Sequence, residues 1–190
     1  MATNLEIEFK NMLTETEYDR LIQTFNIQEE QIWLQKNVYF DTKSHDLKQK
    51  GAALRIRVKN NTYELTLKTK QDVGLLETNQ IISKSEYKAF KYDHVLVKGP
   101  VLDSLLTLGI DVDHLQVITD LATKRAEIPY HNGTLVLDKS FYGEIIDFEV
   151  EYEVSNFEEG QKQFETFLEE YHIERRPAQN KIKRAMEAMK

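Results

Sequence analysis

The sequence predicts an α+β protein built on a large curved or closed antiparallel sheet with a few peripheral helices. Three observations favour this class. Many short segments alternate apolar and polar residues with the period of a strand. Asparagine-containing tight turns join two pairs of these segments, and helical periodicity is confined to a few short stretches. Because the 190 residues contain no linker-like stretch and no internal repeat, we expect a single domain over residues 1–190.

The first two predicted elements come from alternation and a cap. Strict alternation predicts a strand from Leu5 to Met12. Thr14 and Glu17 form a capping-box pattern that begins a helix. The apolar stripe of this helix consists of Tyr18, Leu21, Ile22 and Phe25.

The same reasoning predicts the remaining elements in order. Strands are expected over residues 31–41, 52–59, 62–70, 76–82, 115–130, 134–139 and 145–154. Helices are expected over residues 85–92, 101–108, 157–171 and 181–189. Asn60-Asn61 and Asn132-Gly133 are the predicted hairpin turns. Gly109 is predicted to end the helix over residues 101–108.

Composition excludes several functions. A net charge of −7 argues against broad nucleic-acid binding, which needs a basic face, but allows a local basic site for a small anion. With no cysteine, the chain has no disulfide and no thiolate metal site. No apolar run approaches the ~20 residues that span a bilayer. Because the first residues lack the pattern of a signal peptide, we expect a cytoplasmic protein.

The charged faces of the predicted strands are sorted by sign. Side chains two residues apart share a face of a strand. One strand thus presents Arg55, Arg57 and Lys59, and the next presents Glu64, Thr66, Lys68 and Lys70. The last strand presents Asp147, Glu149, Glu151 and Glu153, while the first presents Glu6, Glu8 and Lys10.

Two interpretations fit this pattern. A half-buried sheet can simply turn a charged face to solvent, although solvent faces normally mix both signs. Alternatively, acidic strands hold hard divalent cations through carboxylate oxygens, and basic strands hold a multiply charged oxyanion. A metal ion together with a phosphate compound satisfies both halves of the second interpretation.

Several motifs resemble those of the CYTH superfamily, which includes class IV adenylyl cyclases, thiamine triphosphatases and inorganic triphosphatases. Glu6-Ile7-Glu8-Phe9-Lys10 is similar to its N-terminal E-x-E-x-K signature. Other segments resemble later family motifs in the same order along nearly the whole chain: Tyr39-Phe40-Asp41, Leu54-Arg55-Ile56-Arg57, Glu64 to Lys68, Glu77, Arg125, Leu137-Asp138, Glu149 with Glu151, and Asn180 to Arg184.

The resemblance implies an eight-stranded antiparallel β-barrel, a triphosphate tunnel, with charged residues inside and helices outside. It implies Mg²⁺ or Mn²⁺ held by Glu6, Glu8, Glu77, Asp138, Glu149 and Glu151, with Glu153 as a further candidate. It implies a triphosphate held by Lys10, Arg55, Arg57, Lys68, Arg125, Lys181 and Arg184, the first four being assigned to catalysis. Phosphoryl transfer depends on positioning and electrostatic stabilisation, so this chemistry needs no protein nucleophile.

Three functions remain open from the sequence. Metal-dependent hydrolysis of a triphosphate ranks first, an adenylate cyclase that makes cAMP and pyrophosphate from ATP ranks second, and a non-catalytic polyphosphate or nucleotide-binding module ranks third. The five histidines show no metal-ligand spacing. The substrate can be inorganic triphosphate, thiamine triphosphate or a nucleoside triphosphate, and the oligomeric state, a homodimer included, stays open.

Overall fold

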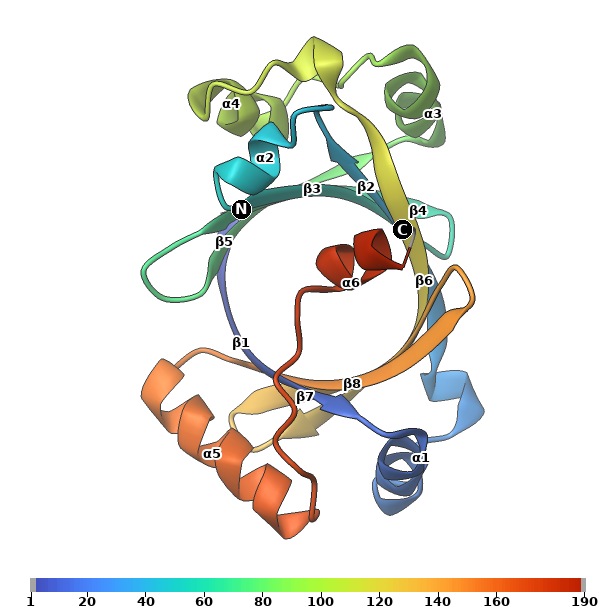
Figure 1. The fold of residues 1–190 in the computed structure, drawn as a ribbon, viewed down its shortest axis with the longest axis vertical. Coiled ribbons are helices and arrows are strands. Elements are labelled where there is room, and N and C mark those ends of the chain that lie inside the picture. Colours follow the sequence, from blue (N-terminus) through green and yellow to red (C-terminus); the bar gives the residue numbers. More distant parts are fainter. Residues whose placement is uncertain (1–2, 189–190) are drawn as a thin grey trace. The chain divides into compact units, whose positions relative to one another are not determined.

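Eight strands form a closed antiparallel barrel in the order β1-β5-β4-β3-β2-β6-β7-β8. The computed structural model describes residues 3–188, which also contain six α-helices (Figure 1). The predicted α+β class and the eight-stranded barrel with peripheral helices are therefore confirmed. The chain divides into two compact units. The first unit contains Gln35–Leu121 and residues up to Leu5, and the second unit contains Glu6–Leu34 and the chain from Ala122 onward.

The first unit is built on a meander of consecutive strands. Its elements are β2 (Trp33–Asp41), α2 (Asp46–Gln49), β3 (Ala52–Lys59), β4 (Thr62–Lys70), β5 (Leu75–Ile82), α3 (Lys84–Asp93), α4 (Pro100–Thr107) and the 3-10 helix η2 (Val112–His114). Asn60 and Asn61 both adopt positive φ, as the predicted tight hairpin turn requires. The short helix α2 was not predicted. Its first amides are held by the buried carboxylate of Asp41, which accepts hydrogen bonds from the backbone N–H groups of Leu47 and Lys48.

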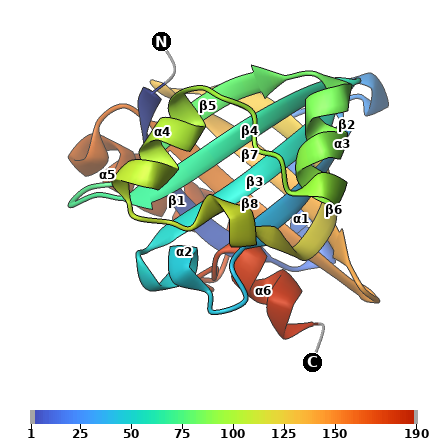
Figure 2. The same cartoon turned by 90° about the horizontal axis from the view of Figure 1, so that it is seen from above.

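Helices α3 and α4 cover one face of this meander. Leu54, Ile56, Leu65 and Leu67 alternate along β3 and β4 and are buried against Phe90, Val101 and Leu105. Figure 2 shows α4 lying across the strands of this unit. Because side chains alternate between the two faces of a strand, Arg55, Arg57 and Lys68 lie on the opposite, inward face. The charged face is thus the inner face of this part of the barrel.

The second unit contains the acidic strands and the C-terminal elements. Its elements are β1 (Thr3–Leu13, from Glu6), α1 (Glu15–Thr24), the 3-10 helix η1 (Glu29–Gln31), β6 (Gln116–Tyr130, from Ala122), β7 (Gly133–Tyr142), β8 (Ile145–Val154), α5 (Phe157–Glu170) and α6 (Lys181–Glu187). The predicted capping box is confirmed, because Thr14 Oγ1 accepts from the Glu17 amide and Glu17 accepts from the Thr14 amide.

Helices α1 and α5 cover the apolar face of this unit. Tyr18 and Leu21 of α1, with Phe164 and Phe167 of α5, pack against the buried residues of β7 and β8. The latter are Leu135, Leu137, Phe148, Val150 and Tyr152. Here too the helices pack against the apolar residues of the strands, and the acidic residues that alternate with them face inward.

One predicted turn was wrong by one residue. The hairpin between β6 and β7 turns at His131-Asn132, not at Asn132-Gly133, because Gly133 is already paired with Tyr130. His131 supplies the positive φ. Gly133 is required by close packing instead, because a Cβ atom there would lie 2.4 Å from the carbonyl oxygen of Glu153. Other boundaries differ by a few residues. Helix α6 ends at Glu187, and the predicted end at Met189 lies outside the described residues.

Candidate active site

Three carboxylates of the second unit form a cluster with the spacing of a metal site. Pairing of β1 with β8 places Glu8 opposite Glu153. One carboxylate oxygen from each of Glu6, Glu8 and Glu153 lies within 4.8 Å of the others. Like charges directly opposite each other destabilise a sheet unless a counter-ion is present. An all-oxygen, anionic donor set suits a hard divalent cation, so this cluster can hold a metal ion.

The repulsion within this cluster is reflected in the acidity of Glu153. Partial burial, together with the negative charges of Glu151, Glu6 and Glu8, raises the pKa of Glu153 to about 7, although Arg125 acts in the opposite direction. The sequence motifs favour Glu149 and Glu151 as metal ligands and leave Glu153 as a further candidate. The structure groups Glu153 with Glu6 and Glu8 because of a strand register that no local pattern specifies.

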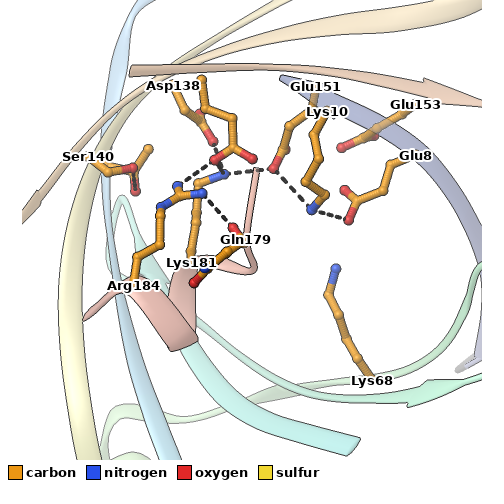
Figure 3. A network of polar contacts seen from close by, with 12 residues as sticks. Glu8, Lys10, Lys68, Asp138, Ser140, Glu151, Glu153, Gln179, Lys181 and Arg184 are labelled. Carbon is orange, nitrogen blue, oxygen red and sulfur yellow. Dashed lines mark hydrogen bonds and ion pairs between the residues drawn. The ribbon is translucent and has the colours of Figure 1, made fainter. Parts of the chain in front are cut away.

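A second acidic group lies deeper in the same unit and is neutralised by side chains. Asp138, Glu149 and Glu151 are buried, with Asp138 paired opposite Glu149 across β7 and β8. Lys181 Nζ from α6 lies 2.9 Å from Asp138 and 2.6 Å from Glu151 (Figure 3). It also lies 2.8 Å from Glu149. A single ammonium group therefore bridges the three predicted metal ligands of this group.

Arg125 from β6 completes the neutralisation. Its Nε and Nη2 atoms donate to the two carboxylate oxygens of Asp138 at 2.8 and 2.6 Å, and Nη2 also donates to Glu151 at 2.8 Å. Two parallel charge-assisted hydrogen bonds fix both position and orientation of a carboxylate. Arg125, predicted as a phosphate ligand, thus holds acidic side chains.

Ion pairing favours the charged forms of Glu151 and Lys181. Burial alone would raise the pKa of Glu151, but Lys181, Arg125 and Lys10 outweigh it and hold that pKa well below its usual range. Burial would likewise lower the pKa of Lys181, yet its carboxylate neighbours raise it well above the ordinary value. Glu151 and Lys181 therefore act as a charged pair rather than as a proton-transfer relay.

Lys10 connects the two acidic groups. Its Nζ atom lies 2.5 Å from Glu8 and 3.7 Å from Glu151 (Figure 3). Burial lowers the pKa of Lys10, but Glu151 and Glu8 raise it by more, so that the net shift is upward. The side chain is 20% exposed. A charged amine with access to solvent between two acidic groups can meet an incoming anion.

Arg184 of α6 contacts Glu149 and, on the same face of β8, Asp147. It lies 2.6 Å from Glu149 through Nη2 and 2.9 Å from Asp147 through Nε. Sequence reasoning placed Asp147 on the same face of β8 as Glu149. It missed Tyr142, whose hydroxyl group donates to Asp147. Both Lys181 and Arg184 reach Oε2 of Glu149, whereas its buried Oε1 atom has no hydrogen-bond partner among residues 3–188. That oxygen is available to a cation.

The inward face of the first unit carries the basic residues. Lys68 lies 2.8 Å from Glu77 and Arg55 lies 3.8 Å from it. Burial raises the pKa of Glu77, but Lys68 and Arg55 outweigh it and lower the pKa. Glu77 was predicted as a metal ligand, and in the structure its carboxylate orients two cations of the predicted phosphate clamp.

Neutral polar side chains order this basic face. Thr66 donates to Asn79 Oδ1 at 2.8 Å, and Asn79 donates to Glu77 at 3.4 Å. Arg57 Nε donates to the buried side chain of Asn37 at 3.3 Å. Sequence reasoning missed Asn37 and Asn79. Their alternation with apolar residues, which places them on the inward faces of β2 and β5, is the signal that could have found them.

A closed barrel with a carboxylate cluster and ordered cations on its inward faces agrees with the resemblance of the sequence motifs. The family model for the CYTH domain matches residues 4–186, and the chain belongs to the CYTH family. Among residues 3–188, no helix has the length and apolar character needed to cross a membrane.

Three relatives illustrate the similarity. "Putative triphosphatase YjbK" of Bacillus subtilis (strain 168) is 46% identical over 188 residues, which cover 98% of this chain and 97% of the relative. The solved structure of a "putative adenylate cyclase" from Bacillus halodurans is 40% identical, with a TM-score of 0.94 over 97% of this chain and 98% of the other. HpAC1 from Hippeastrum, described as having a dominant triphosphatase activity, is 24% identical, with a TM-score of 0.79 over 98% and 97%. At that identity the last comparison supports the fold alone.

Proposed function

We propose that this protein is a metal-dependent triphosphatase that hydrolyses a phosphoanhydride bond of a triphosphate. The observation that carries the proposal is the charge on the inward faces of the strands. The second unit holds a cluster of three carboxylates, and the first unit holds cations that are ordered by Glu77. The name of the 46% identical relative, which describes it as a triphosphatase, supports the same activity. Inorganic triphosphate, thiamine triphosphate and nucleoside triphosphates are the candidate substrates.

Glu6, Glu8 and Glu153 are the proposed residues for holding Mg²⁺ or Mn²⁺, since both ions prefer oxygen ligands. Glu149 is a further candidate through its unpartnered Oε1 atom, and Asp138 and Glu151 adjoin it. When bound, such an ion supplies Lewis-acid polarisation of phosphoryl oxygens and lowers the pKa of a coordinated water. The cations Lys181 and Arg125 keep Glu151 ionised and oriented.

Arg55, Arg57, Lys68 and Lys10 are the proposed groups for binding phosphate oxygens and stabilising the charge that develops on them. Arginine offers forked donors that match a phosphate, and such charge-assisted bonds are the strong ones. Glu77 and Asn37 hold Lys68, Arg55 and Arg57 in place before substrate arrives. Preorganised charges of this kind cost no reorganisation during the reaction. The predicted phosphate contacts of Arg125, Lys181 and Arg184 require these side chains to exchange carboxylate partners for phosphate oxygens.

A cyclase is the second candidate, because the 40% identical solved structure is described as a "putative adenylate cyclase". It would use the same groups, with the ribose 3′-hydroxyl of ATP in place of water as nucleophile. The two reactions differ in their products. Hydrolysis releases orthophosphate or pyrophosphate and leaves no cyclic nucleotide, whereas cyclisation releases cAMP and pyrophosphate in equal amounts.

A product assay tests these alternatives. The protein is incubated with each candidate triphosphate and with Mg²⁺, Mn²⁺ or excess EDTA, and orthophosphate, pyrophosphate and cAMP are measured. We expect metal-dependent phosphate release without cAMP. Stoichiometric cAMP would favour the cyclase. Binding without turnover of any substrate would favour a non-catalytic module and overturn the proposal.

We also infer that residues 1–190 act as one CYTH domain, since β1 and β6 each contribute residues to both units. The partner is then a small triphosphate rather than nucleic acid or a membrane, in keeping with the net charge of −7. A cytoplasmic location and a homodimer stay predictions, to be checked by fractionation and by light scattering.

A further inference from the structure

Asn11 is a polar residue on the apolar side of a strand. Along β1 it shares the outward face with Phe9 and Leu13, which pack against the apolar core of the second unit. Its side chain is completely buried. A buried amide without partners would be costly, so its hydrogen bonds show what it is there to hold.

The hydrogen bonds of Asn11 hold the chain that follows α5. Its Nδ2 group donates to the carbonyl oxygens of Glu174 at 2.8 Å and Met12 at 2.9 Å, and its Oδ1 atom accepts from the Arg176 amide at 2.7 Å. The backbone adds a further contact, because the Met12 amide donates to the carbonyl oxygen of Arg176 at 2.9 Å. An isolated bridge also joins Asn11 to Pro177. Residues 174–177, the C-terminal tether, are thus bound to β1.

A second contact holds the same tether from outside. The Arg176 guanidinium lies 2.7 and 3.1 Å from the two carboxylate oxygens of Glu17. Glu17 also caps α1 by accepting from the Thr14 amide at 2.8 Å. The tether is therefore attached to two rigid elements, a strand and a capped helix.

Helix α6 begins shortly after the tether and depends on it. With seven residues, α6 is shorter than a helix that is stable alone, and its N-cap Asn180 makes no side-chain capping bond. Only Ala185 of this helix is buried. Yet α6 supplies Lys181, which bridges Asp138, Glu149 and Glu151, and Arg184, which contacts Glu149. Besides these ion pairs, the attachment of the tether that precedes α6 limits where these cations can lie.

We infer that Asn11 is a positioning residue for the triphosphatase reaction, acting through the C-terminal tether to place Lys181 and Arg184 on the buried carboxylates. This inference rests on the proposed function. Without Asn11, the carbonyl oxygen of Glu174 and the amide of Arg176 lose their buried partner. The tether then loosens, and Lys181 occupies its three-carboxylate position for only part of the time.

The test is a double-mutant cycle with a matched control. Asn11→Ala, Lys181→Ala and the double variant are compared with Arg20→Ala, which removes a hydrogen bond from α1 to the carbonyl oxygen of Tyr171, just before the tether. We expect Asn11→Ala to lower kcat/KM by roughly 10- to 100-fold, as misplacement of an active-site group does. Arg20→Ala should stay close to the wild type. In the Lys181→Ala background, Asn11→Ala should have a clearly smaller effect, because only the placement of Arg184 is left to disturb.

The outcomes separate this inference from the proposed function. If Asn11→Ala lowers kcat/KM equally in both backgrounds, or if Arg20→Ala causes the same loss, Asn11 is merely structural and the inference is wrong. If Asn11→Ala does not fold, Arg176→Ala serves in the same cycle. If the wild type hydrolyses no triphosphate, the proposed function fails, and amide exchange of residues 181–187 tests the tether alone. Exchange at least about tenfold faster in Asn11→Ala, but not in Arg20→Ala, supports the tether, and unchanged exchange overturns it.

Discussion

Arg125→Met removes the cation that holds Asp138 and Glu151 from β6 while keeping an apolar side chain of similar length. Arg125 makes three hydrogen bonds to these carboxylates, at 2.6 to 2.8 Å, and its side chain is 8% exposed. Asp138 and Glu151 lie on β7 and β8, so their buried carboxylates cannot reach water by the movement of a terminal segment. The variant therefore leaves buried negative charge with less compensation.

The structure sets the expected size of this effect. Breaking a buried ion pair by removing one partner costs about 3–5 kcal/mol. Lys181 still neutralises part of the charge on Asp138 and Glu151, so we expect the lower end, about 3 kcal/mol. In a domain of this size each kcal/mol lowers the melting temperature by about 2–4 °C, which gives a decrease of about 6–12 °C.

The assay is urea unfolding of the metal-free protein at pH 7. Arg125 and Lys181 lower the pKa of Asp138 against the effect of burial. A carboxyl group with a lowered folded-state pKa stabilises the fold above its unfolded-state pKa and loses that contribution as the pH falls. At pH 7 the contribution is fully present. Lys36→Met is the control, because it removes an ion pair with Asp120 whose side chains are 51% and 48% exposed, and such pairs contribute about 0–1 kcal/mol.

Adding Asp138→Asn to Arg125→Met should recover at least about 1 kcal/mol, since the uncompensated charge is then removed. Two results would refute this reasoning. One is an Arg125→Met protein within about 0.5 kcal/mol of the wild type, which is the range of ordinary surface changes. The other is a double variant that is less stable than Arg125→Met, since it would mean that Asp138 is not held by Arg125.

Three further predictions concern ligands and pH. Glu6→Gln and Glu8→Gln should each weaken Mn²⁺ binding and lower turnover. The control is Glu15→Gln, which changes an exposed side chain of α1. Calorimetric affinities of Glu6→Gln and Glu8→Gln equal to that of the wild type would contradict the metal assignment. Arg55→Ala and Arg57→Ala should each weaken triphosphate binding by about 1.5–3 kcal/mol, or roughly 10- to 150-fold, and unchanged titrations would exclude the clamp. The metal-free protein should lose stability as the pH rises from about 5 to 8, because the pKa of Glu153 is raised to about 7 and the folded state binds the extra proton in that window. Glu153→Gln should flatten this slope in melts recorded across the pH range, and an unchanged slope would assign it to another group.

Local sequence patterns determined the elements and their faces. The bounds of β3, β4 and β8 equal the predicted 52–59, 62–70 and 145–154. A period of two depends only on neighbouring residues, so alternation is sufficient to separate Arg55 and Arg57 from Leu54 and Ile56. The helix cap at Thr14 is equally local, since its two hydrogen bonds join residues three apart.

The tertiary structure alone decided which charged residues meet. Alternation gave Glu149, Glu151 and Glu153 the same face and could not choose among them, because the choice depends on the register between β1 and β8. That register places Glu153 opposite Glu8. Lys181 contacts Glu149 and Glu151, and Arg125 contacts Glu151. Asn11 interrupts the apolar face of β1, and the sequence near it gives no reason for this. The reason is its hydrogen bonds to Glu174 and Arg176, which follow α5. Such partners lie far apart along the chain and are brought together only when the whole core folds, so no local pattern encodes them.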